Sequence, residues 1–156
     1  MSAFKTHRIL VVCYGNICRS PMCEALLRRE FGRARLTPPW EASSAGVGAV
    51  PGNPAATGSL RAAARHGLSL EQHRARMLTP EMAAAAEIVV ALDGYVEDQI
   101  LRIAGDIPVR LWPVDDPYGG PEHGYERAFR DVEVHVDRFI QELVDARSND
   151  PEGDGA

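Results

Sequence analysis

Apolar and polar residues alternate along this chain with two different periods, which indicates strands interleaved with helices. The run from Arg8 to Cys13 is continuously apolar after its first residue, as is typical of a strand covered on both faces of a parallel sheet. Farther along, apolar residues recur at helical spacing, most regularly from Tyr125 to Leu143. In chain order, the pattern predicts a strand at 8–13, a helix at 21–31, a strand at 40–44, a helix at 55–66, a helix opening at 79–82, a strand at 87–92, a helix at 95–104, a strand at 109–112 and a helix at 125–143.

Proline and glycine residues mark where several of these elements begin or end. Pro21 suits the first turn of a helix, and Gly32 is expected to end that helix. Thr79 is expected to cap the third helix. The segment 46–54 is dense in Gly and Pro and is predicted to be a loop, whereas 71–78 shows no clear preference.

Strands that alternate with helices imply an α/β fold, namely a doubly wound four-stranded parallel sheet with helices on both faces. Ligands of such sheets bind at the carboxyl ends of the strands, so the loop between the first strand and the first helix is a candidate site. At 156 residues the chain has the size of one domain, predicted at 1–147. The tail at 148–156 has no large apolar residue and is predicted to be disordered.

The net charge of −5 argues against a nucleic-acid partner, because binding to a phosphate backbone requires a concentrated positive field. No apolar stretch is long enough to span a membrane or to form the core of an export signal. The protein is therefore expected to be soluble and cytoplasmic, and to be a monomer or a weak dimer.

All three cysteines, Cys13, Cys18 and Cys23, fall within one short segment. Such clustering is not the disulfide framework of a secreted domain, and it indicates reactive or buried thiols instead. Cys13 stands at the predicted end of the first strand, where a ligand site is expected.

The segment Cys13-Tyr-Gly-Asn-Ile-Cys-Arg-Ser20 has the composition of a phosphate-binding loop. Successive N–H groups of such a loop can face inward around an anion, and the following helix adds the positive end of its dipole. Arg19 can hold two phosphate oxygens in a bidentate fork, and Gly15 can adopt backbone conformations closed to other residues. In that field the thiolate form of Cys13 is favoured, which makes this residue a nucleophile at neutral pH.

Spacing alone is weak support for this site, because Cys23 and Arg29 have the same separation as Cys13 and Arg19. The second pair lies in a predicted helix without a glycine, where no loop can close around an anion. The strand, loop and helix context therefore distinguishes Cys13, although a small buried hydrophobe at a strand end remains the alternative interpretation.

A second candidate for chemistry follows the last predicted strand, in the turn Asp115-Asp116-Pro117-Tyr118. Hydrolysis of a phenol's phosphate ester requires a proton on the leaving oxygen, and a carboxylic acid beside the phosphate loop can deliver it. We identify Asp116 as that acid, while a simple turn without a chemical role is the alternative.

Together these segments resemble the low-molecular-weight protein-tyrosine phosphatase family, whose loop has the form Cys-x5-Arg-Ser and whose acid lies in a late Asp-Pro-aromatic turn. The resemblance covers roughly residues 7–145 in the expected order, and it implies a four-stranded parallel sheet. It is closest in 12–21, in Ser43-Ser-Ala-Gly46, in Gly67-Leu-Ser-Leu70 with His73-Arg-Ala-Arg76, and in Asp116-Pro-Tyr118.

The resemblance implies a role for each matching residue. Cys13 is the nucleophile that forms a phosphocysteine, Arg19 the phosphate clamp, and Asp116 the acid that later activates water. The remaining site residues are Tyr14, Gly15, Asn16, Ile17, Cys18, Ser20 and Tyr118 for phosphate and substrate binding, with Ser44 and His73 in support. No metal or cofactor is implied, because Arg19 and the loop amides supply the positive charge. From the residues alone, Ser20 is equally an N-cap and His73 equally a satisfied histidine.

Two features depart from the usual family pattern. Many members carry an aromatic residue after Ser-Ala-Gly, whereas this chain has Val47-Gly-Ala-Val50, which leaves Tyr118 as the expected aromatic wall. Cys23 stands where relatives more often carry alanine, and a buried helical thiol is the expected interpretation. The aliphatic loop is more similar to bacterial members paired with tyrosine autokinases of exopolysaccharide export. The implied partner is therefore a phosphotyrosine protein and, more narrowly, such an autokinase.

Three other functions compete with this interpretation. An arsenate reductase on the same fold requires additional redox cysteines after the loop, and Cys23 is the only further cysteine there. Protein-arginine phosphatases carry Thr where this chain has Ile17. A phosphate-binding regulator without catalysis is disfavoured by the joint presence of Cys13, Arg19 and Asp116.

Cys18 raises a separate hypothesis about regulation. It lies in the same loop as Cys13, so oxidation of Cys13 can be trapped as a reversible Cys13–Cys18 disulfide. The alternative is that Cys18 simply packs under the loop.

Overall fold

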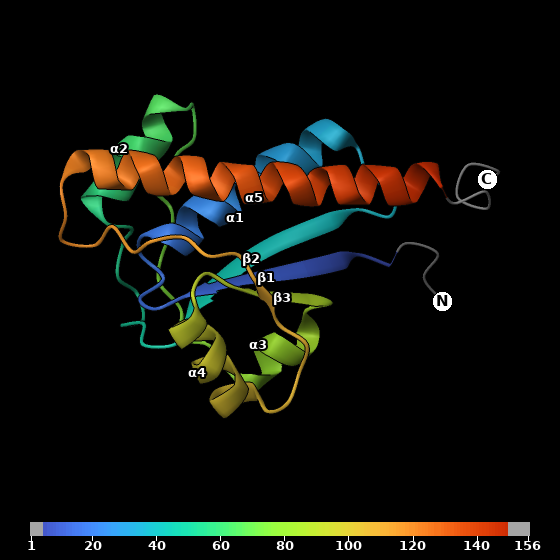
Figure 1. Ribbon diagram of the computed structural model, residues 1–156, viewed down its shortest axis with the longest axis horizontal. Helices are drawn as coiled ribbons and strands as arrows, with labels where there is room; N and C mark the ends of the chain where they lie inside the picture. The colour runs from blue at the N-terminus through green and yellow to red at the C-terminus, as the bar shows by residue number, and fades with distance from the viewer. Residues whose placement is uncertain (1–4, 150–156) are drawn as a thin grey trace.

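The structure is a computed structural model that describes residues 5–149. Within that part of the chain, no helix is both long enough and apolar enough to cross a membrane. Figure 1 shows a central sheet with helices on its two faces. In chain order the elements are β1 (His7–Cys13), α1 (Arg19–Ala34), β2 (Trp40–Gly46), α2 (Thr57–Arg65), α3 (Pro80–Ala85), β3 (Ile88–Ala91), α4 (Gly94–Ala104), β4 (Arg110–Leu111) and α5 (Glu122–Ser148).

The sheet is parallel throughout, with the strand order β2-β1-β3-β4. In its centre, Val11 of β1 lies opposite Ser44 of β2 and Val90 of β3. From Ile9 to Val12 the residues of β1 are at most 1% exposed, as a strand covered on both faces requires. The prediction of a doubly wound, four-stranded parallel α/β sheet is confirmed.

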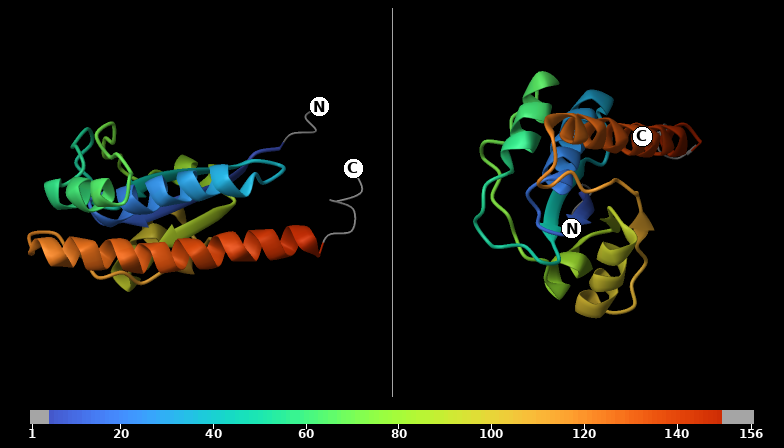
Figure 2. Two further views of the ribbon diagram at one scale, coloured as in Figure 1. Left: turned by 90° about the horizontal axis from the view of Figure 1, so that it is seen from above. Right: turned by 60° about the vertical axis from the view of Figure 1, so that its left-hand side comes forward.

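Side chains of β1 alternate between two cores, one on each face of the sheet. Ile9 and Val11 belong to the core formed with α1 and α5, which includes Phe129. Leu10 and Val12 belong to the core formed with α3 and α4. Figure 1 shows α1, α2 and α5 on one side of the sheet and α3 and α4 on the other. The left-hand view of Figure 2 shows α5 running alongside α1.

The prediction that Gly32 ends the first helix is wrong. α1 begins at Arg19 and continues to Ala34, and Arg35 takes the left-handed conformation that ends it, with φ 50°. Glycine is less favourable than alanine inside a helix by about 1 kcal/mol. The buried side chain of Phe31 and its neighbours on α1 offset that cost by packing in the core.

The last helix is longer at both ends than its apolar pattern indicates. α5 begins at Glu122, directly after Pro121 and before the first apolar position of the helix. It also includes Ser148, so the boundary of the predicted tail at 148–156 lies too early. Residues 150–156 of that tail lie outside the described residues.

Two further segments lie at the edges of the sheet. The strand predicted at 109–112 is confined to Arg110–Leu111, at the edge of the sheet. The segment 71–78, for which the sequence showed no preference, is a loop that joins β2 through one bridge between Gly46 and Met77.

Candidate active site

Residues 14–18 connect β1 to α1 at the carboxyl edge of the sheet, where the sequence predicted a phosphate-binding loop. Backbone groups from two other segments hold this loop. The N–H of Gly48 donates to the Tyr14 carbonyl over 2.9 Å, and the N–H of Ala56 donates to the Ile17 carbonyl over 2.8 Å. The loop is therefore fixed from outside as well as by its own hydrogen bonds.

Asn16 organises the inside of the loop. It is fully buried and has a left-handed backbone with φ 56°, which is uncommon for a residue other than glycine. Its side-chain amide donates to Ser20 Oγ (2.8 Å) and Ser44 Oγ (2.9 Å), while its Oδ1 accepts from the Arg76 N–H (2.8 Å). His73 Nε2 donates to the Asn16 carbonyl over 2.6 Å. Contacts with three separate segments thus hold a strained backbone in place.

The hydrogen bonds around Asn16 run in one direction, because Glu24 can only accept and the amide nitrogen of Asn16 can only donate. Ser44 Oγ donates to Glu24 Oε1 over 2.6 Å, because a carboxylate can only accept. Ser44 therefore accepts from the Asn16 amide, whose second hydrogen goes to Ser20. The Ser20 hydroxyl keeps its own hydrogen for Cys13 Sγ, 2.9 Å away. The network presents a donor to the sulfur, which favours the thiolate.

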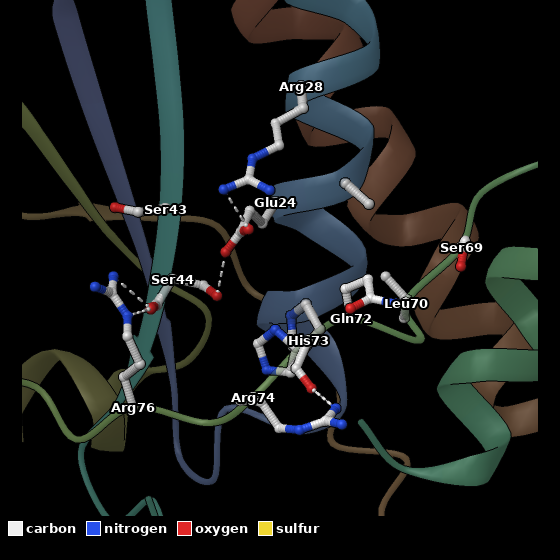
Figure 3. A pocket seen from close by; sticks show the side chains of 12 residues that line it. Glu24, Arg28, Ser43, Ser44, Ser69, Leu70, Gln72, His73, Arg74 and Arg76 are labelled. Atoms are coloured by element: carbon white, nitrogen blue, oxygen red, sulfur yellow. Dashed lines mark hydrogen bonds and ion pairs between the residues drawn. The ribbon is translucent and has the colours of Figure 1, made fainter. Parts of the chain in front are cut away.

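Figure 3 shows the far side of this network, where Glu24 of α1 reaches Ser44 of β2. Arg28 pairs with Glu24 over 2.8 Å. Arg76 donates from Nε and Nη2 to the Ser44 carbonyl, at 3.2 and 3.0 Å. Two arginines thus hold the carboxylate and the strand residue on which Asn16 depends.

Cys13 is 2% exposed, and its sulfur receives a second donor, the Asn16 N–H at 3.3 Å. α1 begins directly after the loop, and its N-cap residue, Cys18, makes no side-chain cap hydrogen bond. The free amides and the positive end of the helix dipole therefore remain available to an anion in the loop.

Arg19 is buried beside the loop and only part of its guanidinium is paired. Nη1 donates to Asp93 Oδ2 (2.8 Å) and to the Val114 carbonyl (2.9 Å), while Nη2 lies 3.8 Å from Asp116 Oδ2. Nε is buried and has no hydrogen-bond partner among residues 5–149. A buried donor without a partner costs about 1–3 kcal/mol. The guanidinium is therefore arranged for an acceptor that a ligand supplies.

One cavity of about 270 Å³ brings the predicted nucleophile, clamp and acid together. Tyr118 and Tyr14 are 67% and 50% exposed and form part of its wall. By contrast, the side chains of Asn16, Ser20, Ser44 and His73 do not line the cavity. The lining residues are Cys13, Tyr14, Gly15, Ile17, Cys18, Arg19, Gly48, Val50, Asn53, Asp116 and Tyr118.

Asp116 is held by the turn that carries it. Its Oδ1 accepts from the Tyr118 N–H over 3.1 Å, in the manner of an Asx turn, and its side chain is half exposed. Its other oxygen, Oδ2, lies toward Arg19. The neighbouring Asp115 is exposed and does not line the cavity. The geometry therefore favours Asp116 over Asp115 as the acid.

The other two cysteines are buried as neutral thiols. Burial raises the pKa of the Cys18 thiol to about 12, and the charges of Cys13 and Asp116 add to the effect. Cys23 is fully buried in α1, and burial raises the pKa of its thiol as well. All three cysteines are free. These properties match the interpretation of Cys23 as a packing residue.

Two charged residues of the site, Asp93 and Glu24, were not among those predicted from the sequence. Asp93 caps α4 by accepting from the Val96 N–H (2.7 Å) and pairs with Arg19 through its second oxygen. Asp93 directly follows the strand predicted at 87–92, and this position was the feature of the sequence that indicated a role at the site. Glu24 was recognisable only as a polar residue on the otherwise apolar face of the first helix, beside the buried Cys23.

An enzyme that splits phosphate monoesters through a cysteine requires an anion cradle around the sulfur and an acid within reach of the leaving group. The cavity meets both requirements, which places the chain in the class of cysteine-dependent phosphatases. Comparison with known proteins gives the family. The profile described as low molecular weight phosphotyrosine protein phosphatase matches residues 8–149. The chain belongs to the low-molecular-weight protein-tyrosine phosphatase family and is a protein-tyrosine phosphatase.

Individual relatives agree with this assignment. The low molecular weight protein-tyrosine-phosphatase Etp of Escherichia coli is 34% identical over 152 residues, which is 92% of this chain and 99% of Etp. The structure of the tyrosine phosphatase Wzb from Escherichia coli in complex with sulphate has a TM-score of 0.80 at 31% identity, covering 87% of this chain and 97% of that one. The YwlE arginine phosphatase from Geobacillus stearothermophilus has a TM-score of 0.77 at 29% identity, covering 90% and 95%.

Proposed function

We propose that Cys13 attacks the phosphorus of phosphotyrosine while Arg19 and the loop amides hold the phosphate oxygens. The observation that carries this assignment is the buried, unpaired Nε of Arg19, in a residue that lines the same cavity as Cys13. A phosphate oxygen supplies the acceptor that Nε lacks. Donors fixed in advance around the oxygens stabilise the charge that develops in the transition state.

Two displacements complete one turnover. In the first, a bond forms between Cys13 Sγ and phosphorus as the bond from phosphorus to the tyrosine oxygen breaks, and Asp116 gives its proton to that oxygen. In the second, Asp116 takes a proton from water, the water oxygen bonds to phosphorus, and the bond from sulfur to phosphorus breaks. Inorganic phosphate leaves and Cys13 is a thiolate again, stabilised by the hydrogen bond from Ser20.

The walls of the cavity support an aromatic leaving group. Tyr14 and Tyr118 provide aromatic surface, and Ile17 and Val50 provide apolar surface. Gly48 permits the position of Tyr14, because a Cβ at Gly48 would lie 2.6 Å from the tyrosine ring. A flat ring can lie among these side chains with its phosphate over the loop.

Three variants test the chemistry. We expect Cys13→Ser to abolish hydrolysis of p-nitrophenyl phosphate, because the sulfur nucleophile is lost. We expect Asp116→Asn to lower kcat by about 100-fold, within the range of general acid catalysis, and to change the pH profile. Asp115→Asn is the matched control and should keep nearly full activity. A slow Asp115→Asn variant beside a normal Asp116→Asn variant would assign the acid to Asp115 instead.

Protein-arginine phosphatase activity is the second candidate, because the YwlE arginine phosphatase shares this fold. Ile17 lines the cavity at the position where those relatives carry Thr, and its larger apolar side chain supports phosphotyrosine. Rates on a phosphotyrosine peptide and on a phosphoarginine peptide decide between the two. A higher kcat/KM on phosphoarginine would reverse the assignment.

We also propose that the physiological substrate is the phosphotyrosine of a cytoplasmic tyrosine autokinase of exopolysaccharide export. The aliphatic loop Val47-Gly-Ala-Val50, with Val50 61% exposed on the cavity wall, supports this narrower assignment by its similarity to that subgroup. An Asp116→Ala variant should retain phosphoproteins from the host lysate as stable complexes. Recovery of phosphoproteins without such a kinase would remove the narrower assignment and leave the chemistry untouched.

A further inference from the structure

A second cavity, of about 550 Å³, lies behind the phosphate loop. α1, β2 and the loop at 69–76 form its walls, and none of its lining residues also lines the cavity of Cys13. Figure 3 shows its side chains, among them Glu24 and Arg28 from α1 and His73, Arg74 and Arg76 from the loop. It is therefore a separate site on the opposite side of the same loop.

This second cavity carries an excess of positive charge. Three arginines, Arg28, Arg74 and Arg76, line it beside one carboxylate, Glu24. Both oxygens of Glu24 are engaged, one by Ser44 and the other by Arg28. The excess is notable because the whole chain has a net charge of −5. A local positive field of this kind attracts anions.

Each of the three guanidinium groups keeps free donors. Arg74 donates only from Nη1, to the Glu71 and His73 carbonyls, and Arg28 donates from Nε to Ala42 and pairs through Nη2. Among residues 5–149, no partner engages Nη1 of Arg28, Nη1 of Arg76, or Nε and Nη2 of Arg74. Figure 3 shows Arg28 beside Glu24, Arg74 turned to the His73 carbonyl and Arg76 at the Ser44 carbonyl. An anion with two phosphoryl groups can use the free donors of more than one of these arginines.

The cavity is also connected to the nucleophile. Its lining residues Glu24 and Ser44 begin the directed hydrogen bonds that pass through Asn16 and Ser20 to Cys13. His73, on the same wall, donates to the Asn16 carbonyl. A ligand that changes the pairing of Glu24 therefore changes the support of the loop on which catalysis depends.

We propose that this cavity is a regulatory site for an anion carrying a diphosphate group, and that its occupation slows the phosphatase. The anion competes with Glu24 for Arg28 and so weakens the hold on Ser44 and Asn16. It also places negative charge behind the sulfur, where negative charge disfavours the thiolate. The inference rests on the nucleophilic role proposed above for Cys13.

Steady-state kinetics with p-nitrophenyl phosphate test the proposal. The probes are methylenediphosphonate, a bare diphosphate analogue, and α,β-methylene-ADP, which carries the same group on a nucleoside; the P–C–P bridge resists hydrolysis in both. At saturation we expect kcat to fall about fivefold, at the lower end for coupled sites. The probe with the lower inhibition constant identifies the source of the diphosphate. Sodium chloride at equal ionic strength should have no such effect.

Reversing the charge of one arginine distinguishes inhibition at this second cavity from inhibition at the active site. Arg74→Glu should remove the inhibition while the activity without probe stays within about twofold, since its exposed side chain touches only loop carbonyls. Arg130→Glu, on the exposed surface of α5, is the charge-matched control and should keep the inhibition. Inhibition that raises only KM, or that survives in Arg74→Glu, would overturn the proposal, and so would the absence of inhibition by both probes. The basal activity and its loss in Cys13→Ser report the proposed function independently.

Discussion

A single buried amide, that of Asn16, joins the carboxylate of Glu24 to the sulfur of Cys13. The amide has two hydrogens, and both are donated, to Ser44 and to Ser20. Ser44 gives its own hydrogen to Glu24 and accepts from Asn16, while the hydroxyl hydrogen of Ser20 stays available to the sulfur. At the scale of single residues, hydrogen bonds therefore link the sulfur to a carboxylate that does not line the catalytic cavity.

We expect Glu24→Gln to lower kcat by about tenfold, which corresponds to about 1.4 kcal/mol in the barrier. The glutamine amide can donate as well as accept, so it no longer requires Ser44 to donate, and the neutral side chain loses its ion pair with Arg28. The measurement is kcat for p-nitrophenyl phosphate hydrolysis at saturating substrate. Glu30→Gln, on the same helix and paired with Arg29 and Arg33, is the control. Equal losses in both variants would contradict the special role of Glu24.

Oxidation of the protein tests the hypothesis that Cys18 protects Cys13. Both thiols line the catalytic cavity and both are free. We expect peroxide to produce a Cys13–Cys18 disulfide that a thiol reductant reverses with recovery of activity, measured by peptide mapping. A sulfinic acid at Cys13 with a free Cys18 would show instead that Cys18 only packs beneath the loop.

At the scale of elements, β2 and the phosphate loop approach each other as closely as their backbones allow. A Cβ placed on Gly46, the last residue of β2, would lie 2.5 Å from the Tyr14 carbonyl oxygen and 2.9 Å from the Asn16 nitrogen. Real Cβ atoms do not approach backbone atoms so closely. The glycine at this position therefore lets the strand support the loop through direct backbone contact.

We expect Gly46→Ala to destabilise the protein by about 2–3 kcal/mol, because the backbone of the loop or the strand must move. Gly32→Ala is the matched control, since a Cβ there meets nothing within 4 Å and the position is helical. The control should stabilise the protein by up to about 1 kcal/mol. Urea unfolding of the two variants beside the wild type measures both effects. A neutral Gly46→Ala would mean that the loop tolerates displacement.

The strand, loop and helix that carry Cys13 could be predicted because their signs are local: a continuous apolar run, a loop with Gly15, and an apolar helical face. The pair of Arg19 with Asp93 could not, because it joins residues far apart in sequence through the side-by-side packing of β1 and β3. The end of α1 was missed for a different reason. Gly32 satisfies the rule for a helix stop, yet core packing carries the helix past it to Arg35.

At the scale of the whole molecule, alkaline pH should weaken the fold. The folded protein keeps the Cys18 proton up to a pKa of about 12, whereas the unfolded chain loses it near the ordinary value of 9.0. Between these values the unfolded state binds fewer protons, so the free energy of unfolding falls as pH rises. Urea unfolding at about pH 8 and about pH 10.5 should show the decline, and Cys18→Ala should reduce it. An equal decline in the variant would exclude Cys18 as a cause.

Inorganic phosphate, the product of each turnover, can supply the acceptor that Arg19 Nε lacks. The product therefore binds to the same donors as the substrate, and any ligand of the folded state also opposes unfolding. At a concentration equal to its dissociation constant, orthophosphate adds about 0.4 kcal/mol to stability. In a phosphate-rich solution part of the enzyme therefore holds its product. Bound phosphate slows catalysis and also stabilises the folded state. The catalytic rate and the lifetime of the folded protein therefore respond in opposite directions to the same ion.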